Sequence, residues 1–158
     1  MTTRTKVVAD EHGVVFGFRH HDGHLDAVVF DRRRRRVQLE LCDVEGGRVV
    51  VHCEGVAWSS VSGLALANVV ATLWLFERSR LLADATLRQR LLVDCGAEVL
   101  AAVDRAVGQE LLVVVECATG ATASILAQQV TFEPGSLQSG SVVPGGDGLR
   151  AADAERRP

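Results

Sequence analysis

The feature that most constrains the fold is an uncharged, largely apolar run from Ser59 to Phe76. Apolar and polar residues do not alternate along this run, so the pattern favours a helix over a half-buried strand. A serine at its start, Ser59 or Ser60, would cap such a helix through its hydroxyl group. The sequence therefore predicts one helix over residues 60–82.

A helix that is apolar on every side is buried either in a protein core or in a membrane. The uncharged run lies at the lower end of the length that spans a bilayer, about 20 residues, and it contains the polar residues Asn68 and Thr72. We therefore expect a core helix and no membrane contact. Gly63, Ala67 and Ala71 fall four residues apart, which favours either a close dimer contact or simply a helix-forming, alanine-rich sequence.

The residues before this helix predict an antiparallel meander of four strands. The dipeptide Asp22-Gly23 is typical of a two-residue hairpin turn, so residues 13–20 and 24–31 are expected to pair. Residues 37–41 alternate between apolar and polar side chains, as a strand with one wet face does. Residues 48–54 are more continuously apolar and predict a central strand.

The residues after the helix predict a second helix and two more strands. Asp84 is expected to cap a helix over residues 85–107, with a kink or break at Gly96. Strands are expected over residues 110–117 and 123–132, with Glu116 opposite Ser124.

The predicted order is ββββ-αα-ββ, which defines an α+β fold with one antiparallel sheet packed around the long buried helix. By architectural analogy alone, this layout resembles hotdog-like folds, which are often completed by dimerisation. Residues 1–132 are expected to form one domain. Residues 133–158 hold all three prolines and many glycines and serines, and are predicted to be a disordered tail.

Composition limits the cellular compartment and the classes of partner that we expect for this chain. The net charge is −3 and the pI is about 5.9, so no overall basic field favours nucleic acid. The four cysteines form no C-x-x-C pair, and the N-terminus lacks the apolar core of a signal peptide. We expect reduced cysteines, a cytoplasmic location and no cofactor. Lys6 is the only lysine, so nearly all basic residues are arginine. This preference for arginine over lysine indicates a GC-rich bacterial genome.

Two ionisable residues at the ends of apolar strands, His52 and Glu116, are candidates for a catalytic acid–base pair. The pair would form if strands 48–54 and 110–117 were neighbours. The alternative is that both side chains simply reach solvent. Residues that would orient a small-molecule ligand beside them are Trp58, Ser59, Asn68, Thr72 and Ser124. Buried polar groups such as Asn68 and Thr72 need partners, so the alternative is that these two only bond neighbouring backbone or water.

A second cluster, His21, His24 and Asp26, flanks the predicted turn. Two imidazoles and a carboxylate are a legitimate metal set. A hairpin tip is exposed and lacks supporting residues, however, so no metal site is expected.

The run Arg32–Arg36 forms a basic turn. It would be a solvated turn, or it would contact an acidic partner protein, a phosphorylated ligand or nucleic acid.

Two functional hypotheses follow from the sequence. The first is a small soluble accessory or protein-interaction domain, a homodimer or the partner of another protein, without catalysis of its own. The alternative is a cofactor-free lyase or isomerase that acts on a small or acyl substrate through His52 and Glu116. The enzyme needs an enclosed pocket with convergent polar groups, whereas the interaction domain needs an exposed contact surface.

Overall fold

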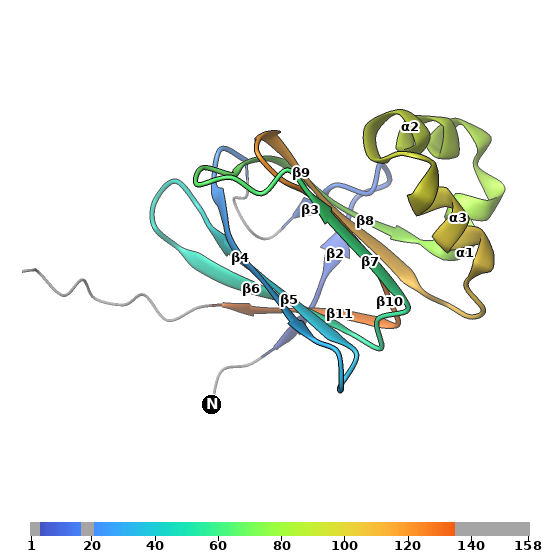
Figure 1. The fold of residues 1–158 in the computed structure, drawn as a ribbon, viewed down its shortest axis with the longest axis horizontal. Coiled ribbons are helices and arrows are strands. Elements are labelled where there is room, and N and C mark those ends of the chain that lie inside the picture. The colour runs from blue at the N-terminus through green and yellow to red at the C-terminus, as the bar shows by residue number, and fades with distance from the viewer. Residues whose placement is uncertain (1–3, 17–20, 135–158) are drawn as a thin grey trace, which may run out of the picture.

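A computed structural model of the chain describes residues 4–16 and 21–134. These residues form antiparallel strands and three short helices (Figure 1). Nine strands make one sheet in the order β1-β11-β6-β5-β4-β8-β9-β10-β7, and β2 and β3 pair separately. The strands are β1 (Thr5–Lys6), β2 (Val8–Ala9), β3 (Val15–Phe16), β4 (His24–Asp31), β5 (Arg36–Cys42), β6 (Arg48–Glu54), β7 (Trp58–Ser62), β8 (Val69–Glu77), β9 (Leu111–Thr119), β10 (Thr122–Ala127) and β11 (Gln129–Pro134), and the helices are α1 (Arg78–Ala83), α2 (Ala85–Cys95) and α3 (Ala97–Arg105).

Two bent chain segments, which pair with each other, join the ends of this sheet. β6 continues through residues 55–57 into β7, and β10 continues through Gln128 into β11. The two paths pair along their length, with Gln129 opposite Glu54 and Leu126 opposite Trp58. Because β10 and β11 lie near opposite ends of the strand order but follow each other in the chain, the sheet curls round on itself.

The curled sheet has apolar residues on its inner face and, along β8 to β10, on its outer face as well. Inner residues such as Leu39, Val51 and Leu73 are at most 1% exposed and form one core. A second core lies between the outer face and the helices, which gather on one side of the sheet (Figure 1). Its members include Phe76, Leu91, Val103, Leu112 and Leu126.

The predicted helix over residues 60–82 is wrong. This segment contains β7, a loop over residues 63–68, β8 and only then α1. β8 lacks alternation because both of its faces are covered: Leu73 lies in the inner core, and Phe76 packs under the helices. Strands buried on both faces read as continuous apolar runs. The predicted packing around a long helix, with its hotdog-like layout, is therefore also wrong. So is the predicted ββββ-αα-ββ order, because in the described residues eight strands precede the three helices and three strands follow them.

The predicted hairpin of residues 13–20 with 24–31 is not formed in the described part of the chain. β3 pairs with β2, and β4 pairs with β5. Asp22 has the positive φ, 62°, expected of the turn, but its N–H donates to the Val70 carbonyl at 2.9 Å. The turn is therefore tied to β8, and residues 17–20 lie outside the described residues.

Several other predictions are confirmed. The antiparallel meander of β4, β5 and β6 is present. Asp84 caps α2 by accepting the Leu87 N–H at 2.9 Å, and Gly96, with a φ of 90°, separates α2 from α3.

The C-terminal strands differ from the prediction in register and extent. Glu116 lies opposite Thr122, not Ser124. The predicted strand over residues 123–132 is broken at Gln128 and reaches Pro134. The remainder of the predicted tail, residues 135–158, lies outside the described residues.

In residues 4–16 and 21–134, no helix combines the length and the apolar character that crossing a membrane requires.

Two glycines test the packing of the outer core. Gly13 and Gly46 both have positive φ values, 86° and 84°. A Cβ at Gly13 would collide with the ring of Phe76, which is 2% exposed, whereas a Cβ at Gly46 would meet open space. Both Gly→Ala variants incur the backbone penalty of about 1 kcal/mol, and Gly13→Ala adds overpacking, for a total loss of about 2–4 kcal/mol. Urea unfolding of the two variants measures the difference, and equal losses would contradict this packing.

Candidate functional site

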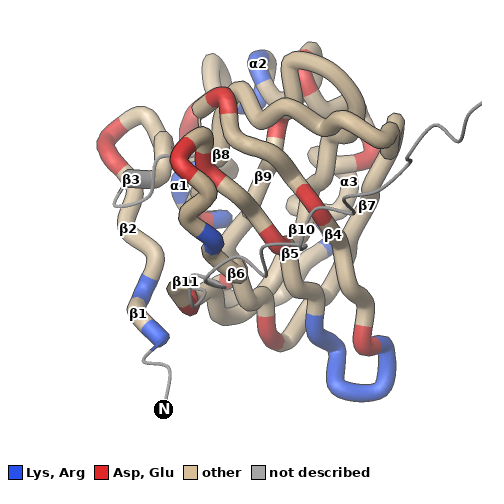
Figure 2. The backbone as a smooth tube through the Cα atoms, turned by 90° about the vertical axis from the view of Figure 1, so that its left-hand side faces the viewer, with Lys and Arg blue, Asp and Glu red and all other residues tan. Residues whose placement is uncertain are grey.

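One exposed, strongly charged element is the loop between β4 and β5. The two strands pair as far as Asp31 opposite Arg36, so Arg32 to Arg35 form the loop. We call residues Arg32–Arg36 the arginine hairpin; Figure 2 shows it as a continuous blue loop that projects from the molecule. The Arg34 N–H donates to Asp31 Oδ1 at 3.0 Å, and the Arg35 N–H donates to the Arg32 carbonyl at 3.3 Å. The loop is therefore ordered by its own hydrogen bonds.

One arm of the arginine hairpin is anchored to the bend between β6 and β7. Arg35 Nε donates to the Val56 carbonyl at 3.0 Å, and the Val56 N–H donates back to the Arg35 carbonyl at 2.9 Å. Arg36 pairs with Glu54 at 3.4 Å. Arg32 and Arg33 are exposed, and their side chains have no partner among the described residues, so their guanidinium groups are available.

The second exposed element is the edge of β7. Among the described residues, β10 is the only strand that pairs with β7. Trp58–Ser62 contains no charge and no proline, although natural proteins usually protect an open edge with such residues. On β6, the strand β11 lies on one side and β5 on the other. Since β10 continues β11, the open edge of β7 lies on the β5 side and begins where the arginine hairpin ends.

His52 lies on the outer face of β6 and is 6% exposed. Its Nδ1 is 3.1 Å from Gln38 Nε2, which donates to it, and its Nε2 is 2.8 Å from Glu133 Oε2. Despite this short distance, His52 Nε2 makes no hydrogen bond among the described residues. Glu133 also pairs with Arg4 at 3.2 Å. His52 is thus part of a polar network that links β11, β6 and β5.

Glu116 lies elsewhere, on the helix-facing side of β9. β6 pairs with β11 and β9 pairs with β10, which continues into β11. His52 lies opposite Thr131 and Glu116 lies opposite Thr122, nine positions apart along this path, so the structure does not bring them together. Glu116 borders a crevice beneath α2 that it shares with Trp74, Arg90 and Asp94. The Arg90 guanidinium carbon lies 4.1 Å from the Trp74 ring centroid, and Arg90 Nε is 3.4 Å from Asp94 Oδ2. The crevice has a volume of about 10 Å³, which is room for one water molecule.

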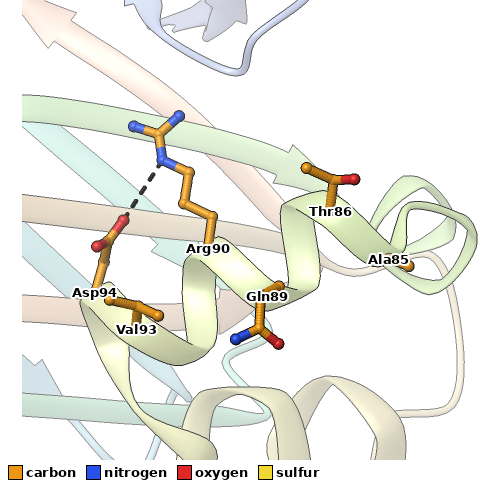
Figure 3. Close-up of a pocket in the computed structure, with 6 residues that line it drawn as sticks. All are labelled: Ala85, Thr86, Gln89, Arg90, Val93 and Asp94. Atoms are coloured by element: carbon orange, nitrogen blue, oxygen red, sulfur yellow. Dashed lines mark ion pairs between the residues drawn. The ribbon is translucent and has the colours of Figure 1, made fainter.

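A wider depression lies along α2 (Figure 3). All of the residues that line it come from this one helix, and Arg90 and Asp94 are paired across it. A ligand site needs walls from several elements that enclose most of the ligand. The depression is therefore an open helix surface. Its residues are Ala85, Thr86, Gln89, Arg90, Val93 and Asp94.

Asn68, predicted to orient a ligand, instead ties three segments together. Its Oδ1 accepts the N–H groups of Ala65 and Ala121, both at 3.0 Å. Its Nδ2 donates to the carbonyls of Leu25 at 3.3 Å and Ala65 at 2.8 Å. These bonds use both donors and both acceptor positions of the amide, so no polar group of the Asn68 side chain is left for a ligand.

The other predicted ligand residues are divided between the two faces of the sheet. Thr72 lies opposite Glu116 on β9, and Ser124 hydrogen-bonds to Cys95 under α2. Trp58 packs against the helix-side core. Ser59 lies opposite Ile125, whose side chain is in the inner core. The structure therefore does not gather these residues around one ligand.

The predicted metal-ligand candidates, His21, His24 and Asp26, each have separate neighbours. His21 Nδ1 contacts Asp22 Oδ2 at 2.9 Å, Asp26 pairs with Arg48 at 3.8 Å, and His24 lies opposite Cys42. Within residues 4–16 and 21–134, no three His, Cys, Asp or Glu side chains come together in a way that could hold a metal ion.

Three cysteine thiols are held in their protonated form. Burial raises the pKa of Cys53, in the inner core, from 9.0 to about 12. Burial also raises the pKa of Cys95, although its hydrogen bond with Ser124 acts in the opposite direction. The pKa of Cys117 is raised by burial and by the nearby charge of Glu116. Since the thiolate is the nucleophile, none of these three is activated for catalysis.

The raised pKa of Cys53 makes stability depend on alkaline pH. Its contribution is complete below pH 9 and is lost as pH rises toward 12, by up to about 1.4 kcal/mol per pH unit. The chain has no tyrosine and Lys6 is its only lysine, so few other groups titrate there. Urea unfolding at pH 8–11 should show a steeper decline for the wild type than for Cys53→Ala. Parallel curves for the two proteins would refute the assignment.

Comparisons with protein-family models, with curated proteins and with solved structures find no match for this chain.

Sequence reasoning named the arginine hairpin but missed the open edge of β7 and the partners of His52. Gln38 and Glu133 lie on different strands, and only the fold places them beside the imidazole ring. The edge had a local signal: Gly63, with a φ of 69°, interrupts the apolar run directly after β7.

Proposed function

We propose that the protein is a small accessory domain that binds another protein and carries out no catalysis of its own. The observation that carries this proposal is the open, uncharged edge of β7. An unpaired strand edge binds an extended segment through main-chain hydrogen bonds, a common mode of protein recognition.

The arrangement of the interior supports the same proposal. The inner face of the sheet is filled by one apolar core, and the space under α2 holds about one water molecule. The alternative enzyme needs His52 and Glu116 in one pocket, but they lie nine positions apart along the β10–β11 path, opposite Thr131 and Thr122. The features that remain available to a partner are on the surface.

Native mass spectrometry of the untagged protein from its own host tests this proposal. We expect the wild type to carry a second protein chain. The mass states whether that chain is another copy or a different protein, which are the two possibilities predicted from the sequence. Lysines at both ends of the β7 edge should remove it, because charged edge residues hinder strand pairing. The variant is Ala57→Lys/Ser62→Lys, whose two positions are exposed.

The control variant is Ser79→Lys/Thr86→Lys, which adds the same charge at exposed positions of α1 and α2. It should keep the second chain. A single wild-type chain that retains a small organic molecule would instead favour the lyase or isomerase. A complex that survives the lysines at β7 would show that the edge is not the contact.

A further inference from the structure

We propose that the partner of β7 is an extended acidic segment of another protein. Its backbone adds to the open edge of β7, and its carboxylates contact Arg32 and Arg33 at the tip of the arginine hairpin. This inference rests on the proposed function and deepens it, because it names the chemistry of the segment that binds.

The two surfaces are adjacent because of the bend between β6 and β7. Arg36 lies opposite Glu54, and Arg35 is hydrogen-bonded to Val56, only two residues before β7 begins. The hairpin therefore ends beside the start of the β7 edge. An added strand advances about 3.3 Å per residue. A segment that pairs with all of β7 thus needs only a few further residues to reach the arginine side chains.

The charge of the hairpin is concentrated and incompletely neutralised. Five of the 17 basic residues occupy consecutive positions in a chain of net charge −3. At the tip, Asp31 is the only carboxylate of the described residues that pairs with Arg34, at 3.7 Å, and both side chains are exposed. Arg32 and Arg33 have no partner among the described residues. Carboxylates are strong, geometrically matched partners for guanidinium groups.

The backbone conformation of the hairpin holds Arg35 in place and leaves the neighbouring arginines at the exposed tip. Arg35 has a φ of 51°, in the left-handed region where glycine or asparagine is favoured. An arginine is disfavoured there because its Cβ crowds the backbone, and its bond to Val56 holds it in place. Arg35 is therefore structural, and its anchored arm leaves Arg32 and Arg33 at the free end.

An acidic protein segment fits this surface better than nucleic acid does. Without the five hairpin arginines, the net charge of −3 becomes −8, so the rest of the chain repels an extended polyanion. Nucleic-acid affinity depends on many phosphate contacts along the backbone. A short peptide can instead place its few carboxylates at the hairpin and its remaining residues along the uncharged β7.

The test uses the full-length protein and a fluorescent eleven-residue peptide, with three glutamates on each side of a Val-Thr-Val-Thr-Val centre. Fluorescence anisotropy at low salt measures its Kd. We expect Arg32→Ser/Arg33→Ser to weaken binding about fivefold to tenfold, as the loss of two exposed ion pairs does. Lys6→Ser/Arg105→Ser removes the same charge at exposed sites elsewhere and should change the Kd less than twofold.

Two altered peptides separate the parts of the proposal. Glutamine in place of glutamate should weaken binding to the wild type to the level of Arg32→Ser/Arg33→Ser. N-methylation of alternate backbone amides in the centre should abolish binding, because it removes the donors that a strand needs. Thermal unfolding of each protein variant checks that its fold is intact.

Four results would overturn the inference. They are equal weakening by the control pair, full binding of the N-methylated peptide, no binding of the parent peptide, and tighter arginine-dependent binding of a single-stranded oligonucleotide with six phosphates. Loss of the second chain with the β7 lysines, together with no effect of Arg32→Ser/Arg33→Ser, would leave the proposed function standing and remove the acidic partner.

Discussion

The structure depends on the bend shared by two paired chain segments. β6 turns into β7 at residues 55–57, and β10 turns into β11 at Gln128. The bend is held from both sides: the Gln128 N–H donates to the Glu54 carbonyl at 3.0 Å, and the Ala57 N–H donates to the Leu126 carbonyl at 2.8 Å. Gly55, with a φ of 65°, packs so closely on Gln128 that a Cβ would press on its side chain. Because β6 and β10 change direction together, pairing continues through the corner.

The same bend creates the surface on which the function is proposed. β5 accompanies β6 only as far as Arg36, opposite Glu54. Beyond the corner, no strand of the described residues lies on that side of β7, and the arginine hairpin lies at the point where β5 ends. An open strand edge and a charged loop far from it would be two ordinary surface features. Because they lie beside one another, they form one proposed contact surface. This surface suits an extended chain rather than a compact ligand.

Predictability from sequence followed the physical signal in each segment. β5 was predictable because one of its faces is wet, so Val37, Leu39 and Leu41 alternate with polar residues. Asp84 and Gly96 were predictable because capping and helix interruption are local. β8 was not, because burial on both faces removes the alternation that distinguishes a strand from a buried helix.

The site was harder to predict than the fold because it depends on which strands are neighbours. His52 and Glu116 end similar apolar strands, but nothing in either strand states that they meet the β10–β11 path at positions nine residues apart. Asn68 was recognised as a buried polar residue that needs partners, which is correct. Its four bonds show that the partners are backbone groups of Ala65, which is nearby in the chain, and of Leu25 and Ala121, which belong to distant segments. The arginine hairpin was visible in the sequence, but its neighbour β7 was not.

The position of β11 has a consequence for how the chain reaches its native state. β11 joins the two ends of the sheet, and β1, the first strand, pairs with it: Thr5 lies opposite Phe132. The contacts that complete the sheet thus connect the two ends of the described chain, and such long loops must be closed before those contacts form. During synthesis, β6 and β7 emerge long before β10 and β11 can cover them. Folding should therefore be slow for a domain of this size. Until β10 is made, β7 is exposed along both of its edges, and one of these edges stays open in the described sheet.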